Sequence, residues 1–368
     1  MKIAIFHNYM DNIGGAELVD LILSKELEAD IYTTSIDKGK IQKMGFSTDN
    51  IYSIGKIPIN PPFKQEFAYW KFRNLNLGKK YDFYIIAGDW AMAAAVHNRP
   101  NLWYVYSPTR EIWDLNKYIR AKMVPWHSKI IFDAWVLFRK FITRIDVKNV
   151  QKIASISINV QTRVKKYLKR DSEVIYPPTN ISNFYYKKNG NFWLSVNRLI
   201  DHKRVEMQLR TFSKIPEEKL IIVGSYENSK HFEIYADYCQ KIKPKNVEIK
   251  SWIDNKELIE LYANCKGFIT TAKDEDLGLT PIEAMAAGKP VIAPNEGGYK
   301  ETIIPEKTGI LIDDITEEKL AKAIKKLGGE IERNPLQYKK NCQAQAKKFD
   351  VEIFIKKIKS SIQASTEL

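Results

Sequence analysis

Cysteine is scarce in this sequence, which has only Cys239, Cys265 and Cys342 among 368 residues. Their odd number and wide spacing exclude a framework of disulfide bonds and a Cys-x-x-Cys metal site. Histidine is scarce as well, and none of the five histidines is paired with another at the spacing of metal ligands. We therefore expect a protein of the reducing cytoplasm that needs no metal and no cofactor.

Long hydrophobic runs are missing too. No segment approaches the roughly 20 apolar residues that cross a bilayer, and the apolar run from Ile3 to Phe6 is far too short for a signal peptide. No G-x-G-x-x-G fingerprint follows this run, which argues against an NAD-dependent enzyme. These absences predict a soluble protein that is cytoplasmic or lies peripherally on the inner face of the membrane.

Positive charge is in excess, with 58 Lys and Arg against 44 Asp and Glu and a net charge of +14. This balance favours phosphates, anionic lipid head groups or nucleic acid as partners, but a lysine-rich solvated surface explains it equally well. Within residues 110–150, aromatic residues such as Trp113 and Trp126 alternate with basic ones. Such a stretch can lie in an anionic membrane interface, or its aromatics can face the core.

Continuous apolar runs alternate with helical patterns along the chain, which predicts an α/β protein with parallel sheets. The expected strands lie at 2–7, 31–33, 83–87, 102–106, 193–196, 220–224, 247–249, 267–270 and 290–293. The pattern is interrupted at Tyr176-Pro177-Pro178, where two prolines fit a linker. We predict a first domain at 1–173, a second domain at 174–345, and a C-terminal helix within 346–368 that could pack on either domain.

The strongest local signal is the segment from Glu275 to Glu283, which begins just after an expected strand. Gly278 suits a turn, Thr280 is a good N-cap, and Pro281 suits the first helical position. This pattern places a helix N-terminus after a strand, where unpaired N–H groups favour an anion. The segment therefore predicts a diphosphate site.

Two carboxylates flank this turn, and each has two interpretations. Glu275 could accept hydrogen bonds from sugar hydroxyls, or it could be a solvated surface residue. Glu283 could hold the hydroxyls of a ribose, or it could close a capping box with Thr280. The acidic run Asp274-Glu275-Asp276 has no distant partner and is weak evidence for a metal site.

Further motifs extend from the first loop to the end of the second domain. They are Gly14-Gly15-Ala16-Glu17, Tyr176-Pro177-Pro178, Asn197-Arg198-Leu199 with Lys203, the E-x7-E pattern of Glu275 and Glu283, the run 287–292, the run 295–301, and Lys307-Thr308-Gly309. Together they resemble the family 4 glycosyltransferases, in particular the mannosyltransferase-like branch. The resemblance implies a GT-B fold, in which two Rossmann-like domains have parallel sheets that face a central donor cleft. It also implies retaining, metal-independent transfer of a hexose from a nucleotide sugar.

The resemblance assigns roles to charged residues of the second domain. Arg198 and Lys203 would hold the donor diphosphate and stabilise the charge on the leaving nucleotide, whereas a solvated basic loop is the alternative. Glu275 is similar to the family residue that contacts the donor sugar, and Glu283 to the one that holds the ribose. Arg198, Lys203 and Glu275 are therefore the catalytic candidates.

The remaining donor contacts would come from backbone and from one aromatic residue. Gly14 and Gly15 would let the backbone approach the donor closely, although a glycine pair by itself is more often a simple turn. The amides of Gly278 and Leu279 would bind phosphate or sugar oxygens. Trp252 would lie near the base, or it would belong to the core.

One motif departs from the family pattern. Members of this branch usually have His-Ser/Thr-Pro in the first domain, whereas this chain has Tyr106-Ser107-Pro108, followed by Arg110. The change puts a sugar contact or proton relay by that histidine in doubt. Tyr106 and Arg110 remain the candidates on the acceptor side.

The sequence thus predicts a hexosyltransferase that uses GDP-mannose or a UDP-sugar and acts on a glycan or lipid-linked acceptor. Possible further partners include an anionic membrane surface, and no nucleic acid is expected. Two alternatives remain. One is a basic, non-catalytic nucleic-acid-binding protein with Rossmann-like domains, and the other is a degenerate family member without activity.

Overall fold

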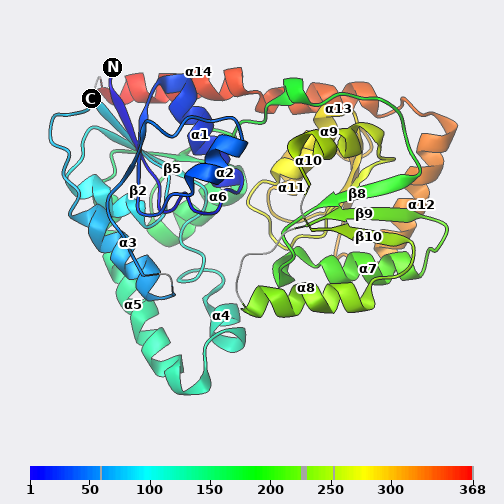
Figure 1. Ribbon diagram of the computed structural model, residues 1–368, viewed down its shortest axis with the longest axis horizontal. Helices are drawn as coiled ribbons and strands as arrows, with labels where there is room; N and C mark the ends of the chain where they lie inside the picture. The colour runs from blue at the N-terminus through cyan, green and yellow to red at the C-terminus, as the bar shows by residue number, and fades with distance from the viewer. Residues whose placement is uncertain (59, 225–229, 252, 367–368) are drawn as a thin grey trace. The chain divides into compact units, whose positions relative to one another are not determined.

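The computed structural model describes residues 1–58, 60–224, 230–251 and 253–366. The chain folds into two α/β units, each built on a parallel sheet (Figure 1). The first unit contains Met1–Pro177 and the C-terminal end from Phe354, and the second contains Pro178–Ile353.

The unit boundaries lie four and eight residues later than the predicted 173/174 and 345/346. Strand β7 (Glu173–Val174) still pairs with the first sheet, and the amide of Ile175 also bonds back to Ser155 in that sheet at 3.0 Å. The first unit therefore continues until the two prolines, which cannot extend a sheet.

The first unit holds a seven-stranded sheet in the order β3-β2-β1-β4-β5-β6-β7, and every pairing is parallel. Its other strands are β1 (Ile3–Phe6), β2 (Asp30–Thr33), β3 (Ile51–Ser53), β4 (Phe83–Ile86), β5 (Asn101–Val105) and β6 (Lys152–Ser155). Its helices are α1 (Gly15–Leu27), α2 (Lys38–Lys43), α3 (Phe63–Arg73), α4 (Asn116–Lys122), α5 (Lys129–Asp146), α6 (Ile158–Arg163) and most of α14 (Val351–Thr366). Strands β1, β4 and β5 are buried along their whole length, as expected for a parallel sheet covered on both faces.

The C-terminal helix α14 packs on the first unit. The rings of Tyr104 in β5 and Phe354 in α14 lie 5.6 Å apart. The Lys152 ammonium donates to the carbonyl of Ser361 at 3.4 Å, and the Ser361 hydroxyl donates to the Glu173 carboxylate. These contacts join the end of the chain to strands β5, β6 and β7.

The second unit holds a six-stranded parallel sheet in the order β10-β9-β8-β11-β12-β13. Its strands are β8 (Phe192–Val196), β9 (Lys219–Val223), β10 (Val247–Lys250), β11 (Phe268–Ile269), β12 (Val291–Pro294) and β13 (Gly309–Ile312). Its helices are α7 (Val205–Ser213), α8 (Lys230–Ile242), α9 (Asn255–Asn264), α10 (Leu279–Ala286), α11 (Tyr299–Thr302), α12 (Glu317–Arg333) and α13 (Lys339–Ala346). Trp193, Phe268 and Met285 are fully buried between these layers.

Strand order reverses once in each sheet, between β1 and β4 in the first and between β8 and β11 in the second. In open α/β sheets, ligands bind beyond the carboxyl ends of the strands at such a reversal, because the flanking loops diverge there. The two reversals therefore mark where a site is expected in each unit.

Candidate functional site

The strand reversal of the second sheet brings the donor candidates of that unit together. Arg198 and Lys203 follow the carboxyl end of β8, and Glu275 and Gly278 follow that of its neighbour β11. Helix α10 starts directly after this turn, so its N-terminus, which carries partial positive charge, belongs to the same edge of the sheet.

Lys203 and Glu275 form an ion pair at the centre of this edge. The Nζ–Oε2 distance is 2.5 Å, and the side chains are 14% and 21% exposed. Burial alone would raise the pKa of Glu275, but Lys203, with help from His202 and Arg198, lowers it below its usual value. Glu275 is therefore ionised at neutral pH and can only accept hydrogen bonds. It can thus act as the acceptor for sugar hydroxyls that donate.

The loop that carries Glu275 is held by a second charged pair, which sequence reasoning missed. Arg204 donates to the carbonyl of Thr271 at 2.6 Å and to Glu296 Oε1 at 3.0 Å. The other oxygen of Glu296 accepts the amide of Asp274 at 3.1 Å. Two features of the sequence could have pointed to this pair: Arg204 directly follows Lys203, and Glu296 lies within the 295–301 motif.

Two glycines of that motif permit close packing against the same loop. A Cβ added to Gly298 would lie 2.4 Å from the Cα of Leu277, and one added to Gly297 would lie 2.4 Å from the carbonyl oxygen of Glu275. The amide of Gly298 donates to that carbonyl at 2.8 Å. This glycine pair therefore positions the Glu275 turn, because no side chain fits between the two segments.

The start of α10 differs from the prediction. The helix begins at Leu279, and its N-cap is Gly278 with φ of 89°, not Thr280. Gly278 adopts this left-handed conformation at no steric cost, so the chain enters the helix two residues earlier than expected. Pro281 then lies within the first turn, where its missing N–H removes no hydrogen bond.

The capping-box interpretation of Glu283 is consequently wrong. Glu283 is too far along the helix to cap it, and it accepts a hydrogen bond from the Tyr262 hydroxyl of α9 at 2.7 Å. Burial raises the pKa of Glu283, and this hydrogen bond partly offsets the effect. Tyr262 is itself fixed by stacking on Phe268 of β11 at 5.8 Å, so Glu283 has a defined position beside the turn.

In the first unit, Gly14 and Gly15 lie where the loop after β1 enters α1. Gly14 is the N-cap, and its amide donates to the Glu17 carboxylate at 2.8 Å. The other oxygen of Glu17 lies 3.2 Å from His7 Nε2. The glycine motif thus belongs to a polar network in which His7 and Asp20 are buried.

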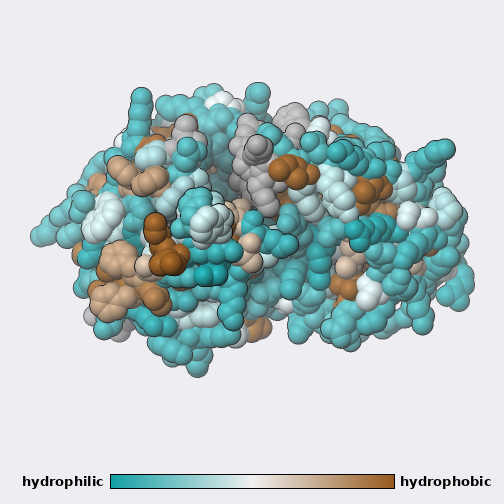
Figure 2. Space-filling model, turned by 90° about the horizontal axis from the view of Figure 1, so that it is seen from below, coloured by the Kyte–Doolittle hydropathy of each residue, from teal (hydrophilic) through white to brown (hydrophobic). Residues whose placement is uncertain are grey.

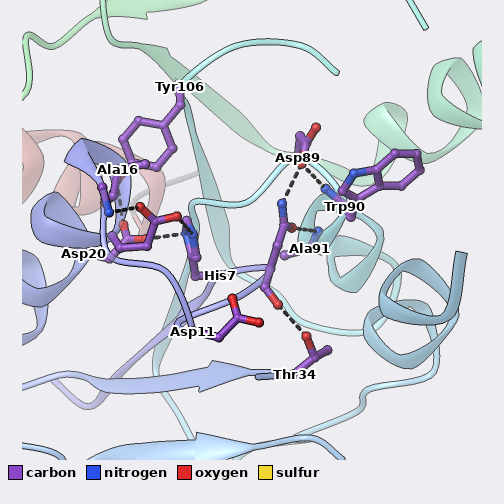
Figure 3. A network of polar contacts seen from close by, with 12 residues as sticks. His7, Asp11, Ala16, Asp20, Thr34, Asp89, Trp90, Ala91 and Tyr106 are labelled. Atoms are coloured by element: carbon purple, nitrogen blue, oxygen red, sulfur yellow. Dashed lines mark hydrogen bonds and ion pairs between the residues drawn. The ribbon is translucent and has the colours of Figure 1, made fainter. Parts of the chain in front are cut away.

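The centre of this network is His7, which sequence reasoning missed. Its Nδ1 lies 2.5 Å from Asp20 Oδ2. Burial alone would lower the pKa of His7, but Asp20 and Glu17 raise it to about 10. The Tyr106 hydroxyl reaches Asp20 Oδ1 at 2.7 Å and the carbonyl of Ala16 at 3.0 Å, so Tyr106 is tied to α1 (Figure 3).

A second link joins the loops that follow β1 and β4, the two strands at the reversal of the first sheet. The Asn8 amide donates to Asp89 Oδ1 at 2.6 Å and accepts the backbone N–H of Ala91 at 2.8 Å (Figure 3). Arg110 lies further along and pairs with Asp114 at 2.7 Å. Trp252, the candidate for base recognition, lies outside the described residues.

Neither a metal site nor a membrane span is found in the part of the chain that the structure describes. Within those residues, no three His, Cys, Asp or Glu side chains are grouped so that they could hold a metal ion. None of the helices among them is long and apolar enough to cross a membrane.

Comparison with known proteins supports the resemblance. Residues 179–349 match the family model of the glycosyl transferases group 1. The alpha-1,3/1,6-mannosyltransferase ALG2 of Dictyostelium discoideum is 27% identical, and the match covers 66% of each chain. The O-antigen chain mannosyltransferase RfbU of Salmonella typhimurium is 26% identical over 56% of this chain and 65% of its own length. The match thus spans slightly less than two thirds of these relatives.

Solved structures match over nearly the whole chain. HepE of Anabaena, solved in complex with UDP, superposes with a TM-score of 0.77 at 17% identity, covering 99% of this chain and 100% of its own. Sucrose-phosphate synthase of Thermosynechococcus elongatus gives 0.74 at 17% identity, covering 99% and 98%. These matches confirm the predicted two-domain α/β architecture. The family model and the mannosyltransferase relatives favour the glycosyltransferase interpretation over a nucleic-acid-binding protein. Residues 179–349 therefore form a group 1 glycosyl transferase domain, and the chain as a whole has a GT-B fold.

Proposed function

We propose that this protein transfers a hexose from a nucleotide sugar to a glycan or lipid-linked acceptor in the cytoplasm, with retention of the anomeric configuration and without a metal. The observation that carries the proposal is the pairing of Lys203 with the ionised Glu275 beside the N-terminus of α10. This edge combines fixed positive charge for a diphosphate with a carboxylate for sugar hydroxyls.

Two donors remain the main candidates. GDP-mannose is supported by the similarity to proteins described as mannosyltransferases. A UDP-sugar is supported by the similarity to HepE, which has been solved with UDP and with UDP-glucose.

In the proposed reaction, the bond between the anomeric carbon and the diphosphate oxygen breaks as the acceptor hydroxyl attacks from the same face. The acceptor proton passes to the departing diphosphate oxygen. Lys203 and Arg198 stabilise the negative charge that grows on the leaving group, and Glu275 orients the sugar through its hydroxyls. No carboxylate is assigned as a covalent nucleophile, so no glycosyl-enzyme intermediate is proposed.

A thermal-shift panel of nucleotide sugars tests the donor. The true donor stabilises the folded state by about 2.7 kcal/mol at 100 times its dissociation constant, which raises the melting temperature. Lys203→Ala should abolish this donor-induced rise. Lys219→Ala is the matched control, because Lys219 is exposed at the amino end of β9, the opposite edge of the same sheet, and it should retain the rise.

The chemistry is tested with the donor that the panel identifies. NMR of the product should show the anomeric configuration of the donor, and EDTA should leave the rate unchanged. An inverted product would contradict the same-face displacement, and loss of activity with EDTA would contradict metal independence. If no nucleotide sugar raises the melting temperature, the proposed function itself is wrong.

A further inference from the structure

The first unit exposes an unusual number of large hydrophobic side chains in one region. Trp126, Ile130, Ile131, Leu137 and Phe141 are between 62% and 83% exposed, and all lie in α5 or just before it. Figure 2 shows hydrophobic side chains gathered on this side of the molecule, with hydrophilic ones around them. Scattered surface hydrophobics are ordinary, but a cluster of this kind marks an interaction surface.

Helix α5 presents its hydrophobic residues to solvent on one side only. The exposed residues recur at helical spacing, from Ile130 through Leu137 and Phe141 to Ile145. The opposite side is buried through Val136 and Arg139. The helix is thus amphipathic with its most hydrophobic side facing outward, the reverse of the arrangement that would cover a core.

Helix α3 adds a second row of exposed aromatic residues. Phe63, Phe67 and Trp70 follow one another at i, i+4 and i+7 and are 59%, 51% and 49% exposed. The other side of α3 faces the core through Ala68 and Phe72, which are fully buried.

Polar contacts lock α3 and α5 side by side. Glu66 accepts from Trp135 Nε1 at 2.6 Å and pairs with Arg139. Further along both helices, Asp146 accepts from the Tyr69 hydroxyl at 2.7 Å and pairs with the guanidinium of Arg73.

These contacts show that the helices run in the same direction, and in each the hydrophobic row lies opposite the residues that face the core. The two rows therefore face the same way, outward from the unit. Together they form one surface, here called the apolar face. It consists of Phe63, Phe67, Trp70, Trp126, Ile130, Ile131, Leu137, Phe138, Phe141 and Ile145.

Basic residues accompany the apolar face. Residues 116–150 contain eight Lys and Arg but only two Asp, and of the eight bases only Arg139 is buried. Lys140 and Arg144 of α5 lie 5.4 Å and 5.2 Å from the ring of Trp113, and Lys122 and Lys148 are exposed near the two ends of the segment. Each such charge near an anionic surface contributes attraction, which salt weakens.

We propose that the apolar face docks on an anionic lipid bilayer, with α3 and α5 lying in its interface. Outward-facing Trp, Phe and Ile side chains with bases nearby match what an interfacial helix needs. Charge complementarity selects an anionic bilayer as the partner, since a protein interface depleted of charge would not call for this excess of bases. The inference is independent of the proposed transfer reaction, because none of these residues belongs to the candidate site.

Sedimentation with vesicles tests this inference on the full chain. The protein should pellet with phosphatidylglycerol vesicles at low salt, pellet less with phosphatidylcholine vesicles, and dissociate as salt rises. The triple variant Trp126→Ser, Ile130→Ser, Ile131→Ser should bind at least about tenfold more weakly. The matched control is Ile234→Ser with Leu336→Ser, which removes two side chains that are 61% and 56% exposed in the second unit. It should bind as the wild type does.

Three outcomes would overturn the proposal. The first is a wild-type protein that does not pellet with phosphatidylglycerol vesicles at low salt. The second is a triple variant that pellets as well as the wild type, which would place lipid binding elsewhere. The third is a wild-type dimer, seen by light scattering, that the triple variant converts to a monomer, since the face would then bind a second copy of the chain. Donor-induced thermal shifts measured on the same variants should be unchanged, so failure here is distinct from failure of the proposed function.

Discussion

The substitution Glu275→Gln separates recognition of the sugar from recognition of the diphosphate. Gln keeps the shape of the side chain and can still accept a hydrogen bond from Lys203, but it removes the negative charge. The carboxylate is ionised in the wild type because the positive charge of Lys203 lowers its pKa despite burial. The variant therefore replaces charge-assisted hydrogen bonds by neutral ones at one position of the site.

The expected magnitude follows from the geometry of the ion pair. A hydrogen bond to a charged group contributes about 1.5–3 kcal/mol, and one between neutral groups about 0.5–1.5 kcal/mol. With Lys203 only 14% exposed, we expect the free energy of unfolding to fall by about 1 kcal/mol. Each sugar hydroxyl that donates to Glu275 should lose about 1–2 kcal/mol in the transition state, which lowers kcat/KM roughly 5- to 30-fold.

Calorimetric titration of two ligands checks the assignment. Glu275→Gln should weaken binding of the nucleotide sugar while leaving binding of the corresponding nucleoside diphosphate nearly unchanged. Lys203→Met should weaken both, because it removes charge from the diphosphate site. If Glu275→Gln weakens both ligands equally, Glu275 acts only by orienting Lys203. If it weakens neither, the assignment of Glu275 to the donor sugar is refuted.

Three further predictions concern Gly298 beside the Glu275 turn, Glu283 as the proposed ribose contact, and the buried His7. Gly298→Ala should lower the free energy of unfolding by about 1–3 kcal/mol in chemical denaturation, because its Cβ would clash with the neighbouring backbone. The control is Gly329→Ala, which has open space around the added Cβ and should leave the free energy of unfolding unchanged or raise it. Glu283→Gln should weaken binding of both the nucleoside diphosphate and the nucleotide sugar in titration calorimetry, with little change in melting temperature. If only the melting temperature falls, Glu283 stabilises the fold and does not bind the donor. The pKa of His7 is raised from 6.5 to about 10, so protonated His7 stabilises the fold fully below pH 6.5, and this contribution is lost as pH rises toward and through 10. The free energy of unfolding should therefore fall over that range. Asp20→Asn should make this dependence of the free energy of unfolding on pH less steep. An equal slope in both proteins would contradict the ion pair.

Local sequence was sufficient to predict the buried strands and to point to one edge of the second sheet as the candidate site. Strands such as β1 and β4 are recognisable because a parallel strand covered on both faces is apolar throughout. The site edge followed from a strand, a glycine and a helix start in succession. The strands β3, β7 and β13 were not predicted, and of these β3 and β7 have only three and two residues, too few for a periodic signal. The start of α10 was placed two residues late, because the left-handed conformation of Gly278 is a property of the folded backbone.

What only the tertiary structure decided is which distant residues meet. The Lys203–Glu275 pair joins positions 72 apart in sequence, and the Arg204–Glu296 pair joins positions 92 apart. Such pairs exist because parallel strands bring their carboxyl ends to one edge of the sheet, so loops remote in sequence become neighbours. The same holds for the outward orientation of α5. Its amphipathic pattern was evident in the sequence, but a pattern cannot say which side faces the core, and the contacts that α3 and α5 make through Glu66 and Asp146 settle it.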